Sequence, residues 1–189
     1  MKKIVTIVGA RPQFIKAAVL SRIIANNKEI KEILVHTGQH FDTNMSAIFF
    51  DEMQIPKPMY NLGINTLGHG AMTGLMLQKI EEILIKEKPD LVVVYGDTNS
   101  TIAGALAAKK LHVKVVHIEA GLRSFNIKMP EEINRILTDR ISDMLCCPTK
   151  NAIKNLEQEG FNNFDCKIVQ SGDIMKDAVE FYSKIASNK

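Results

Sequence analysis

The chain has 189 residues, of which 46% are hydrophobic and 24% are charged, proportions that are ordinary for a globular protein with a full core. The net charge of +3 comes without a block of like charge, and the 6% of aromatic residues do not interleave with basic ones, so the sequence shows no nucleic-acid-binding footprint. Charges interrupt every apolar stretch, which excludes the run of roughly 20 apolar residues that a membrane-spanning helix needs.

Apolar runs typical of strands alternate with segments whose apolar residues recur every three to four positions, the period of a helix. The first run resembles the start of a signal peptide, but it is short and basic residues follow at once, so we predict a strand. In chain order the predicted elements are a strand at 3–8, a helix at 12–26, a strand at 32–36, a helix at 43–53, a loop at 55–70, a helix at 71–87, a strand at 91–95, a helix at 98–111, a strand at 114–118, a helix at 131–142, a strand at 144–147, a helix at 149–160, a strand at 167–170 and a helix at 173–186.

This alternation predicts an α/β fold with a doubly wound parallel sheet, Rossmann-like, whose strands are joined by right-handed crossovers. The three cysteines form neither a disulfide framework nor a zinc pattern, which favours a reducing cytoplasmic compartment. No cluster of His, Cys and Asp residues has the spacing of a metal site. His112 and His117 are predicted to be structural.

Three acidic residues follow predicted strands in a way that points to a ligand site. Asp97 and Glu119 each come directly after a short apolar run, and Glu131 stands twelve positions after Glu119. A buried parallel strand carries no charge in its middle, so an acid at its carboxyl end points into the crevice where α/β sheets bind ligands. We therefore expect these carboxylates to lie close together and to perform acid/base chemistry on a small molecule.

Each acid also has a structural interpretation. In that interpretation, Asp97 or Thr98 simply caps the next helix. Glu119 is a structural residue paired with Arg123. Glu131 follows a proline and lies in the first turn of a predicted helix, where an acid is favourable to the helix dipole. For Glu131 taken alone, the structural interpretation is the stronger one.

The turn after the first predicted strand has the residue types of an anion site. Backbone N–H groups at the start of a helix bind anions, and Arg11 or Lys16 would add positive charge. The segment Gly9-Ala10-Arg11-Pro12 is not G-x-G-x-x-G, and no Walker lysine follows, so the sequence predicts neither a dinucleotide nor an ATP site. Arg11 either contacts a polyanion or is a surface arginine.

Four separate motifs, in this order and spacing, resemble the non-hydrolysing UDP-N-acetylglucosamine 2-epimerases: Gly9-Ala10-Arg11-Pro12-x-x-x-Lys16, Gly96-Asp97-Thr98, His117-x-Glu119-Ala120-Gly121-Leu122-Arg123 and Pro130-Glu131-Glu132-x-Asn134-Arg135. The resemblance covers essentially the whole chain but only about the amino-terminal half of such an enzyme. It implies the first half of a GT-B architecture, with residues 1–172 as the first Rossmann-like domain and 173–189 as a helix leading towards the interdomain hinge. The second domain, which in the family supplies most UDP contacts and a catalytic histidine, has no counterpart in the sequence.

The resemblance also implies roles for individual residues. Asp97, Glu119 and Glu131 match the family's three acidic catalytic positions, and Arg11 and Lys16 match its basic residues near the nucleotide and the sugar. The family reaction eliminates UDP to give a 2-acetamidoglucal and then re-adds UDP with C2 inverted. That chemistry needs a base and an acid at C2 and positive charge at the departing UDP. No hydride moves, so the resemblance implies no nicotinamide, no other cofactor and no metal.

Some positions depart from the common family pattern. The segment Ala10-Arg11-Pro12-Gln13 stands where many members have Thr-Arg-Pro-Glu, and the stretch between Arg123 and Pro130 is shorter than in many of them. Together with residues 37–42 and 123–126, these departures resemble a branch that acts on UDP-2,3-diacetamido-2,3-dideoxy-glucuronate. The sugar's substituents at C3 and C6 are therefore left open, whereas the reaction class is not.

The sequence is compatible with three functions. The first is the amino-terminal domain of a UDP-sugar 2-epimerase that serves surface-polysaccharide precursor synthesis. The second is a GT-B glycosyltransferase acceptor domain, which needs no carboxylates around C2. The third is a non-catalytic UDP-sugar-binding domain, because one wall of a cleft cannot enclose a substrate. The expected partners are a UDP-sugar and the missing carboxyl-terminal UDP-binding domain, without nucleic acid or membrane, and a homodimer is left open.

Overall fold

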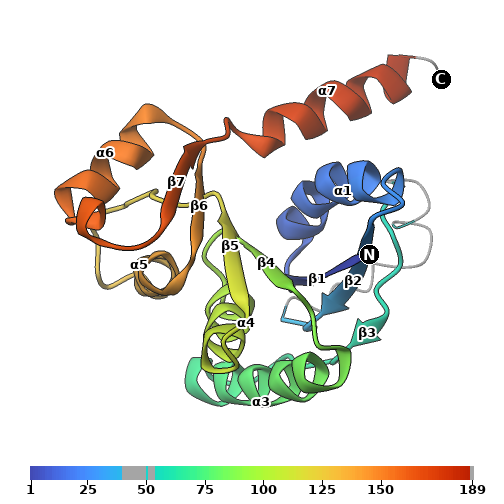
Figure 1. The fold of residues 1–189 in the computed structure, drawn as a ribbon, viewed down its shortest axis with the longest axis horizontal. Helices are drawn as coiled ribbons and strands as arrows, with labels where there is room; N and C mark the ends of the chain where they lie inside the picture. Colours follow the sequence, from blue (N-terminus) through green and yellow to red (C-terminus); the bar gives the residue numbers. More distant parts are fainter. Residues whose placement is uncertain (40–49, 51–53, 188–189) are drawn as a thin grey trace.

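The computed structural model describes residues 1–39, 50 and 54–187. Its elements follow one another as strand and helix along the chain (Figure 1). They are β1 Lys2–Val8, α1 Arg11–Ala25, β2 Ile30–His36, β3 Tyr60–Asn61, α3 His69–Glu87, β4 Leu91–Tyr95, α4 Asn99–Lys110, β5 Lys114–Ile118, α5 Pro130–Ile141, β6 Met144–Cys147, α6 Lys150–Gln158, the short 3₁₀ helix η1 Phe161–Asn163, β7 Lys167–Gln170 and α7 Ile174–Ser187.

The strands form one sheet in the order β3-β2-β1-β4-β5-β6-β7, and every neighbouring pair is parallel. The chain builds outward from β1 to β3, then crosses back to β4 and builds in the other direction. The strand order therefore reverses between β1 and β4, which is the position where open α/β sheets bind their ligands. The predicted doubly wound parallel sheet is confirmed.

Helices cover both faces of the sheet. In Figure 1, α1 and α7 lie above the sheet, α3 and α4 lie below it, and α5 and α6 flank β6 and β7. Strand side chains alternate between the two layers, as a pleated strand requires. Val92 and Val94 pack in the core that contains α3 and α4, whereas Val93 and Tyr95 pack in the core that contains α1. No helix in the described ranges is long and apolar enough to cross a membrane.

Helix α4 lies close to the sheet because its buried residues are small. A Cβ on Gly104 would come within 3.1 Å of Ile7 and 3.2 Å of Val94, and the buried alanines of α4 leave similarly little bulk between the helix and the sheet. The helix begins with Thr98 as its N-cap, whose hydroxyl oxygen accepts from the Thr101 N–H. This packing places the turn at residues 96–98 directly over the ends of β1 and β4.

The predicted strands at 91–95, 114–118, 144–147 and 167–170 agree with the structure in both bounds. The prediction that 55–70 is entirely loop is wrong, because Tyr60 and Asn61 form the edge strand β3 and pair with Val35 and His36 of β2. A two-residue strand is too short to show a period in the sequence. The predicted helix at 43–53 lies outside the described residues, apart from residue 50, which is helical.

Candidate active site

Asp97 and Glu119 lie side by side at the carboxyl edge of the sheet, as the sequence predicts. Strand β4 pairs with β5 up to Tyr95 opposite Ile118, and the Gly96 N–H donates to the Ile118 carbonyl at 3.0 Å. A Cβ on Gly96 would lie only 3.3 Å from Glu119 Oε2. The two acids thus stand beside the switch point between β1 and β4.

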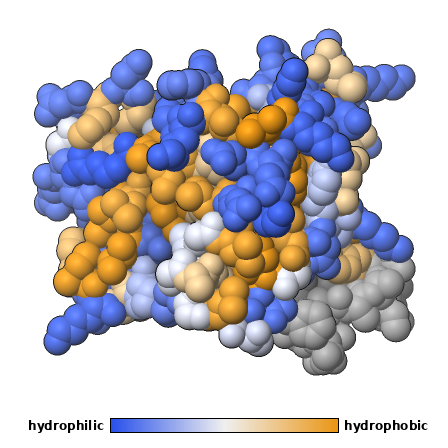
Figure 2. Space-filling model, turned by 90° about the horizontal axis from the view of Figure 1, so that it is seen from below, coloured by the Kyte–Doolittle hydropathy of each residue, from blue (hydrophilic) through white to orange (hydrophobic). Residues whose placement is uncertain are grey.

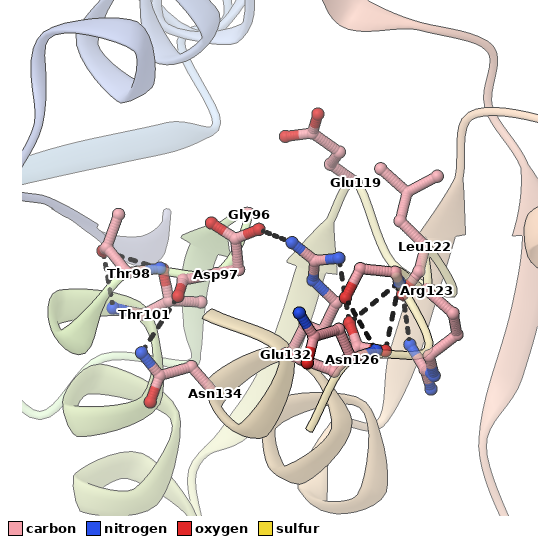
Figure 3. Close-up of polar contacts among 12 residues, drawn as sticks. Gly96, Asp97, Thr98, Thr101, Glu119, Leu122, Arg123, Asn126, Glu132 and Asn134 are labelled. Atoms are coloured by element: carbon pink, nitrogen blue, oxygen red, sulfur yellow. Dashed lines mark hydrogen bonds and ion pairs between the residues drawn. The ribbon is translucent and has the colours of Figure 1, made fainter. Parts of the chain in front are cut away.

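The Asp97 carboxylate is held by a cation and takes no part in capping. The Arg135 guanidinium of α5 forms an ion pair with Asp97 Oδ2, and Asn134 Nδ2 donates to the Asp97 carbonyl at 3.0 Å (Figure 3). Thr98 serves as the cap of α4, so the capping interpretation holds for Thr98 and not for Asp97. The side chain of Asp97 is 32% exposed, which leaves its carboxylate open to the rim.

Glu119 is held by a different cation, and its backbone is strained. The Lys16 ammonium of α1 forms an ion pair with Glu119 Oε2, so the suggested pairing of Glu119 with Arg123 is wrong. Glu119 has φ 72°, in the left-handed region that a non-glycine residue adopts only at a cost. Figure 3 shows its side chain pointing away from the hydrogen-bonded group around Asp97 and Glu132. Strain of this kind at a ligand-binding edge supports a functional role.

Glu131, the third predicted acid, lies on helix α5, whereas the other two follow strands. It is exposed in the first turn of α5. In the described part of the chain its carboxylate makes no hydrogen bond or ion pair with Asp97 or Glu119. The structure thus places Asp97 and Glu119 on adjacent strand ends and Glu131 at the exposed start of α5, and the predicted cluster of all three acids stays a prediction.

Glu132, which the sequence reasoning missed, is the buried acid of α5. It is 2% exposed and accepts hydrogen bonds from the N–H groups of Ser124 and Phe125, at 3.0 and 2.8 Å. Arg135 Nη1 donates to it at 3.0 Å. Burial works against the charged form, but the hydrogen bonds and the arginine prevail and hold the pKa of Glu132 below its ordinary value.

Arg135 thus joins Glu132 to Asp97 in one network of ion pairs. Of its two contacts, only the one between Arg135 and Glu132 has a signature in the sequence. Glu132 and Arg135 are three positions apart, a spacing at which opposite charges meet on a helix surface. The pairing of Arg135 with Asp97 spans 38 positions and has no local signature. The buried Glu132 is an anchor that sets the position of the arginine, and the arginine in turn sets the position of Asp97.

The turn after β1 differs from the expected anion cradle. The side chain of Gln13 accepts from the N–H groups of Gly9 and Ala10 at 2.7 and 3.1 Å, the Gln13 N–H donates to the Ala10 carbonyl, and Pro12 has no N–H. These backbone donors are engaged within the turn. Positive charge for an anion at this edge therefore comes from the helix dipole and from the side chains of Arg11, which is exposed, and Lys16.

Gln13 also connects the two turns of the switch point. Its amide Nε2 donates to the Tyr95 carbonyl at 2.6 Å and to the hydroxyl oxygens of Thr98 and Thr101 at 3.0 Å. Gln13 is 3% exposed, and an unpaired buried amide would be costly. One side chain of α1 thereby fixes the turn that carries Asp97 relative to the turn that carries Arg11.

No group of three or more His, Cys, Asp or Glu side chains in the described ranges could hold a metal ion. The arrangement at the edge is instead two carboxylates, each paired with a cation, beside a further exposed arginine. Such a site can exchange protons with a substrate and offer positive charge to an anionic group.

A sequence model described as UDP-N-acetylglucosamine 2-epimerase matches residues 22–189. The chain belongs to the UDP-N-acetylglucosamine 2-epimerase family. Within this family it is 61% identical over 186 residues to the UDP-2,3-diacetamido-2,3-dideoxy-D-glucuronate 2-epimerase of Pseudomonas aeruginosa, covering 98% of this chain and 52% of that protein. It is 49% identical to the UDP-N-acetylglucosamine 2-epimerase of Methanocaldococcus jannaschii, covering 97% of this chain and 50% of that protein.

Solved structures of the epimerase family share the fold. The Methanocaldococcus jannaschii UDP-GlcNAc 2-epimerase in complex with UDP-GlcNAc and UDP superimposes with a TM-score of 0.93 at 48% identity, covering 100% of this chain and 51% of that one. MurG of Acinetobacter baumannii, at 15% identity and a TM-score of 0.60, shares the fold alone. The chain spans about half the length of the relatives that it matches.

Proposed function

We propose that this chain is the amino-terminal, acid-bearing domain of a UDP-sugar 2-epimerase. The enzyme inverts C2 of UDP-N-acetylglucosamine, or of a related UDP-diacetamido-uronic acid, and serves the synthesis of surface-polysaccharide precursors. The observation that carries the proposal is the pair Asp97 and Glu119, set on adjacent strand ends at the switch point and each held by a cation. The 61% identity to a diacetamido-glucuronate 2-epimerase supports that sugar as a substrate.

The reaction uses the acids on the two faces of the sugar ring. A carboxylate removes the proton from C2, the C–H electrons form the C1–C2 double bond, and UDP leaves from C1 with its electron pair. A UDP oxygen then attacks C1, and an acid delivers a proton to C2 from the opposite face. We assign these proton transfers to Asp97, Glu119 and Glu131 as a set. We assign Arg11 and Lys16 to binding the UDP-sugar, because the negative charge that develops on the departing UDP needs cations nearby.

We place the second wall of the cleft in the part of the relatives that the match to this chain does not cover. We propose residues 1–172 as the Rossmann-like domain and 173–189 as the helix that leads towards the hinge and a carboxyl-terminal UDP-binding domain. The start of α7 supports this division, because the helix follows Gly172 in a left-handed turn with φ 81°. Helix α7 then packs on α1, where the Arg22 guanidinium lies 3.6 Å from the centre of the Phe181 ring.

Two further parts of the proposal concern the surroundings of the enzyme. The cytoplasm is supported by the three cysteines, all of which are free thiols, as a reducing compartment keeps them. A homodimer is supported by apolar side chains that gather on the face seen in Figure 2. Exposed apolar residues on the helices of this layer include Leu106 of α4 and Ile133 and Leu137 of α5, and such patches mark association surfaces.

The test is solvent exchange at C2. The full-length protein is incubated with each UDP-sugar in deuterated water, and NMR follows the product. We expect the C2 epimer, with deuterium at C2. Asp97→Asn and Glu119→Gln keep the side-chain shapes, remove the bases, and should each lower the exchange rate at least about 100-fold. Asp165→Asn, which changes an exposed acid, is the matched control. Sugar transfer without exchange would establish a glycosyltransferase, and binding without exchange a non-catalytic domain.

A further inference from the structure

His117 lies on β5, two positions before Glu119, and is completely buried. Both of its ring nitrogens face oxygen atoms. Nδ1 is 2.7 Å from Asp139 Oδ1 of α5, and Nε2 is 2.7 Å from the Gly96 carbonyl oxygen. A carbonyl oxygen only accepts hydrogen bonds, and so does an ionised carboxylate. A neutral imidazole has a single N–H and would leave one of these contacts as two facing lone pairs.

The surroundings of Asp139 favour its ionised form. Its other oxygen, Oδ2, accepts from Arg123 Nη1 at 2.7 Å and from the Gly121 N–H at 3.2 Å. The side chains of Asp139 and Arg123 are 0% and 1% exposed. A buried guanidinium in direct contact stabilises the charge of a carboxylate. The proton between Asp139 and His117 therefore belongs to the histidine.

The charges around the buried pair also favour a cation at His117. Arg123 donates to both carboxylate oxygens of Glu159, at 2.6 and 2.9 Å, so it is shared between the buried Asp139 and a second anion, Glu159, whose side chain is 27% exposed. One arginine therefore faces two carboxylates. The adjacent thiol of Cys147 contributes no charge, because burial and the charge of Asp139 raise its pKa to about 12. A buried net charge is costly, and an imidazolium at residue 117 removes it.

We infer that His117 is a doubly protonated imidazolium at neutral pH and that it positions the Gly96–Asp97 turn through the Gly96 carbonyl. Gly96 has φ 61°, a conformation that glycine adopts freely, so the turn needs an external contact to set its direction. A charged donor makes a stronger hydrogen bond than a neutral one. His117 is therefore a positioning residue. The protonation of His117 does not depend on the proposed function; only the chemical role of Asp97, which His117 helps to position, rests on it.

The test is ¹⁵N–¹H NMR of the histidine rings in the 189-residue chain at neutral pH. Ring ¹⁵N shifts distinguish nitrogens with and without a proton, and His117→Asn identifies the signals of this ring among those of the five histidines. We expect protons on both nitrogens of His117. A single ring proton overturns the inference, and because no epimerase activity is measured, that result would leave the proposed function standing.

Asp139→Asn tests the cause. The amide introduced by this substitution would donate to Nδ1, so the ring should become neutral, with one proton on Nε2, and the backbone N–H signals of Gly96 and Asp97 should shift. Asp165→Asn, at an exposed acid, should leave the ring and both signals unchanged. A ring that stays doubly protonated in Asp139→Asn contradicts the charge argument. If that variant does not fold, the ring protonation of the unmodified chain decides the question alone.

Discussion

Glu119 combines a left-handed backbone conformation with a place on the edge that carries the candidate site. Its φ is 72°. The cost of this conformation is offset by hydrogen bonds to β6, since the N–H groups of Glu119 and Ala120 both donate to the Cys146 carbonyl, at 3.1 and 3.0 Å. A residue in this conformation aims its side chain differently from one that continues the strand. The strain therefore accounts for how an acid directly after β5 reaches Lys16 of α1.

We predict that Glu119→Gly is more stable than Glu119→Ala by about 1 kcal/mol, the reverse of the usual order, because only alanine keeps the left-handed strain. Both variants lose the carboxylate and the pairing with Lys16, so their difference isolates the backbone. Urea unfolding of the two proteins measures it. At Glu82, an exposed position inside α3, the same pair should show alanine as the more stable variant. Equal stabilities at 119 would contradict the strain argument.

His36 supplies a pH dependence at the same scale. Burial lowers its pKa from 6.5 to about 4, so the folded chain holds it neutral where the unfolded chain would protonate it. The unfolded state then binds more protons between these values, and stability is lost as the pH falls from 6.5 towards 4. The free energy of unfolding should fall by at most about 3 kcal/mol from this residue.

His36→Phe tests this contribution. The substituted ring can keep the edge contact with Phe14, whose ring centroid lies 4.8 Å away. Urea unfolding at several pH values should give a shallower loss of stability between pH 6.5 and 4 in the variant than in the unmodified chain. His112→Asn, at a position outside the core, should leave the slope unchanged. An unchanged slope in His36→Phe would show that another group causes the acid sensitivity.

At the scale of elements, helix α5 organises one side of the site. Four of its residues reach the turns beyond β4 and β5. They are Glu132, Asn134, Arg135 and Asp139. Glu132, Arg135 and Asp139 are three and four positions apart and share one side of the helix, whereas Asn134 reaches the Asp97 carbonyl from an adjacent side. The family motif in this helix thus has a structural reading, in which the buried acid anchors the arginine and the amide anchors the backbone of Asp97.

We predict that Arg135→Lys lowers the turnover of the full-length protein about 100-fold, although it keeps the charge. The guanidinium contacts Glu132 and Asp97 with different nitrogens, whereas an ammonium cannot present that fork. A misplacement of about 1 Å at a reacting group costs about 10²-fold. Steady-state rates measure the effect. Arg140→Lys on the same helix, whose arginine stacks on Phe161, is the control, and equal losses in both variants would mean a general effect on α5.

The sequence predicted these elements better than the contacts between them. Apolar periodicity is a local property, so β4 to β7 and the doubly wound sheet could be predicted, as could the placing of Asp97 and Glu119 on one edge. Side-chain partners are not local: Lys16 and Glu119 are 103 positions apart. Glu132 was missed because an acid beside another in a first helical turn is typical of a solvated helix start, and only tertiary packing shows which of the two is buried.

At the scale of the whole molecule, the proposed function gives this chain one wall of a cleft. The carboxylates of Asp97 and Glu119 lie on an edge that α1 and α5 hold in place but do not cover, with side chains 32% and 23% exposed. A substrate on such an open edge stays in contact with water, which weakens each electrostatic interaction. The relatives have about twice the length of this chain, enough for a second wall.

We predict that the 189 residues alone bind UDP-sugars weakly and turn them over at less than about 1% of the rate of the full-length protein, because a single wall neither encloses the sugar nor excludes water from the acids. Calorimetric titration gives the affinity, and deuterium exchange at C2 gives the rate, for both proteins side by side. The unfolding free energy of the short chain serves as the control, since a folded but inactive chain separates a missing wall from a missing fold. Comparable rates would mean that the acids and cations of this edge suffice for the chemistry, and that the remaining half serves a purpose other than closing the site.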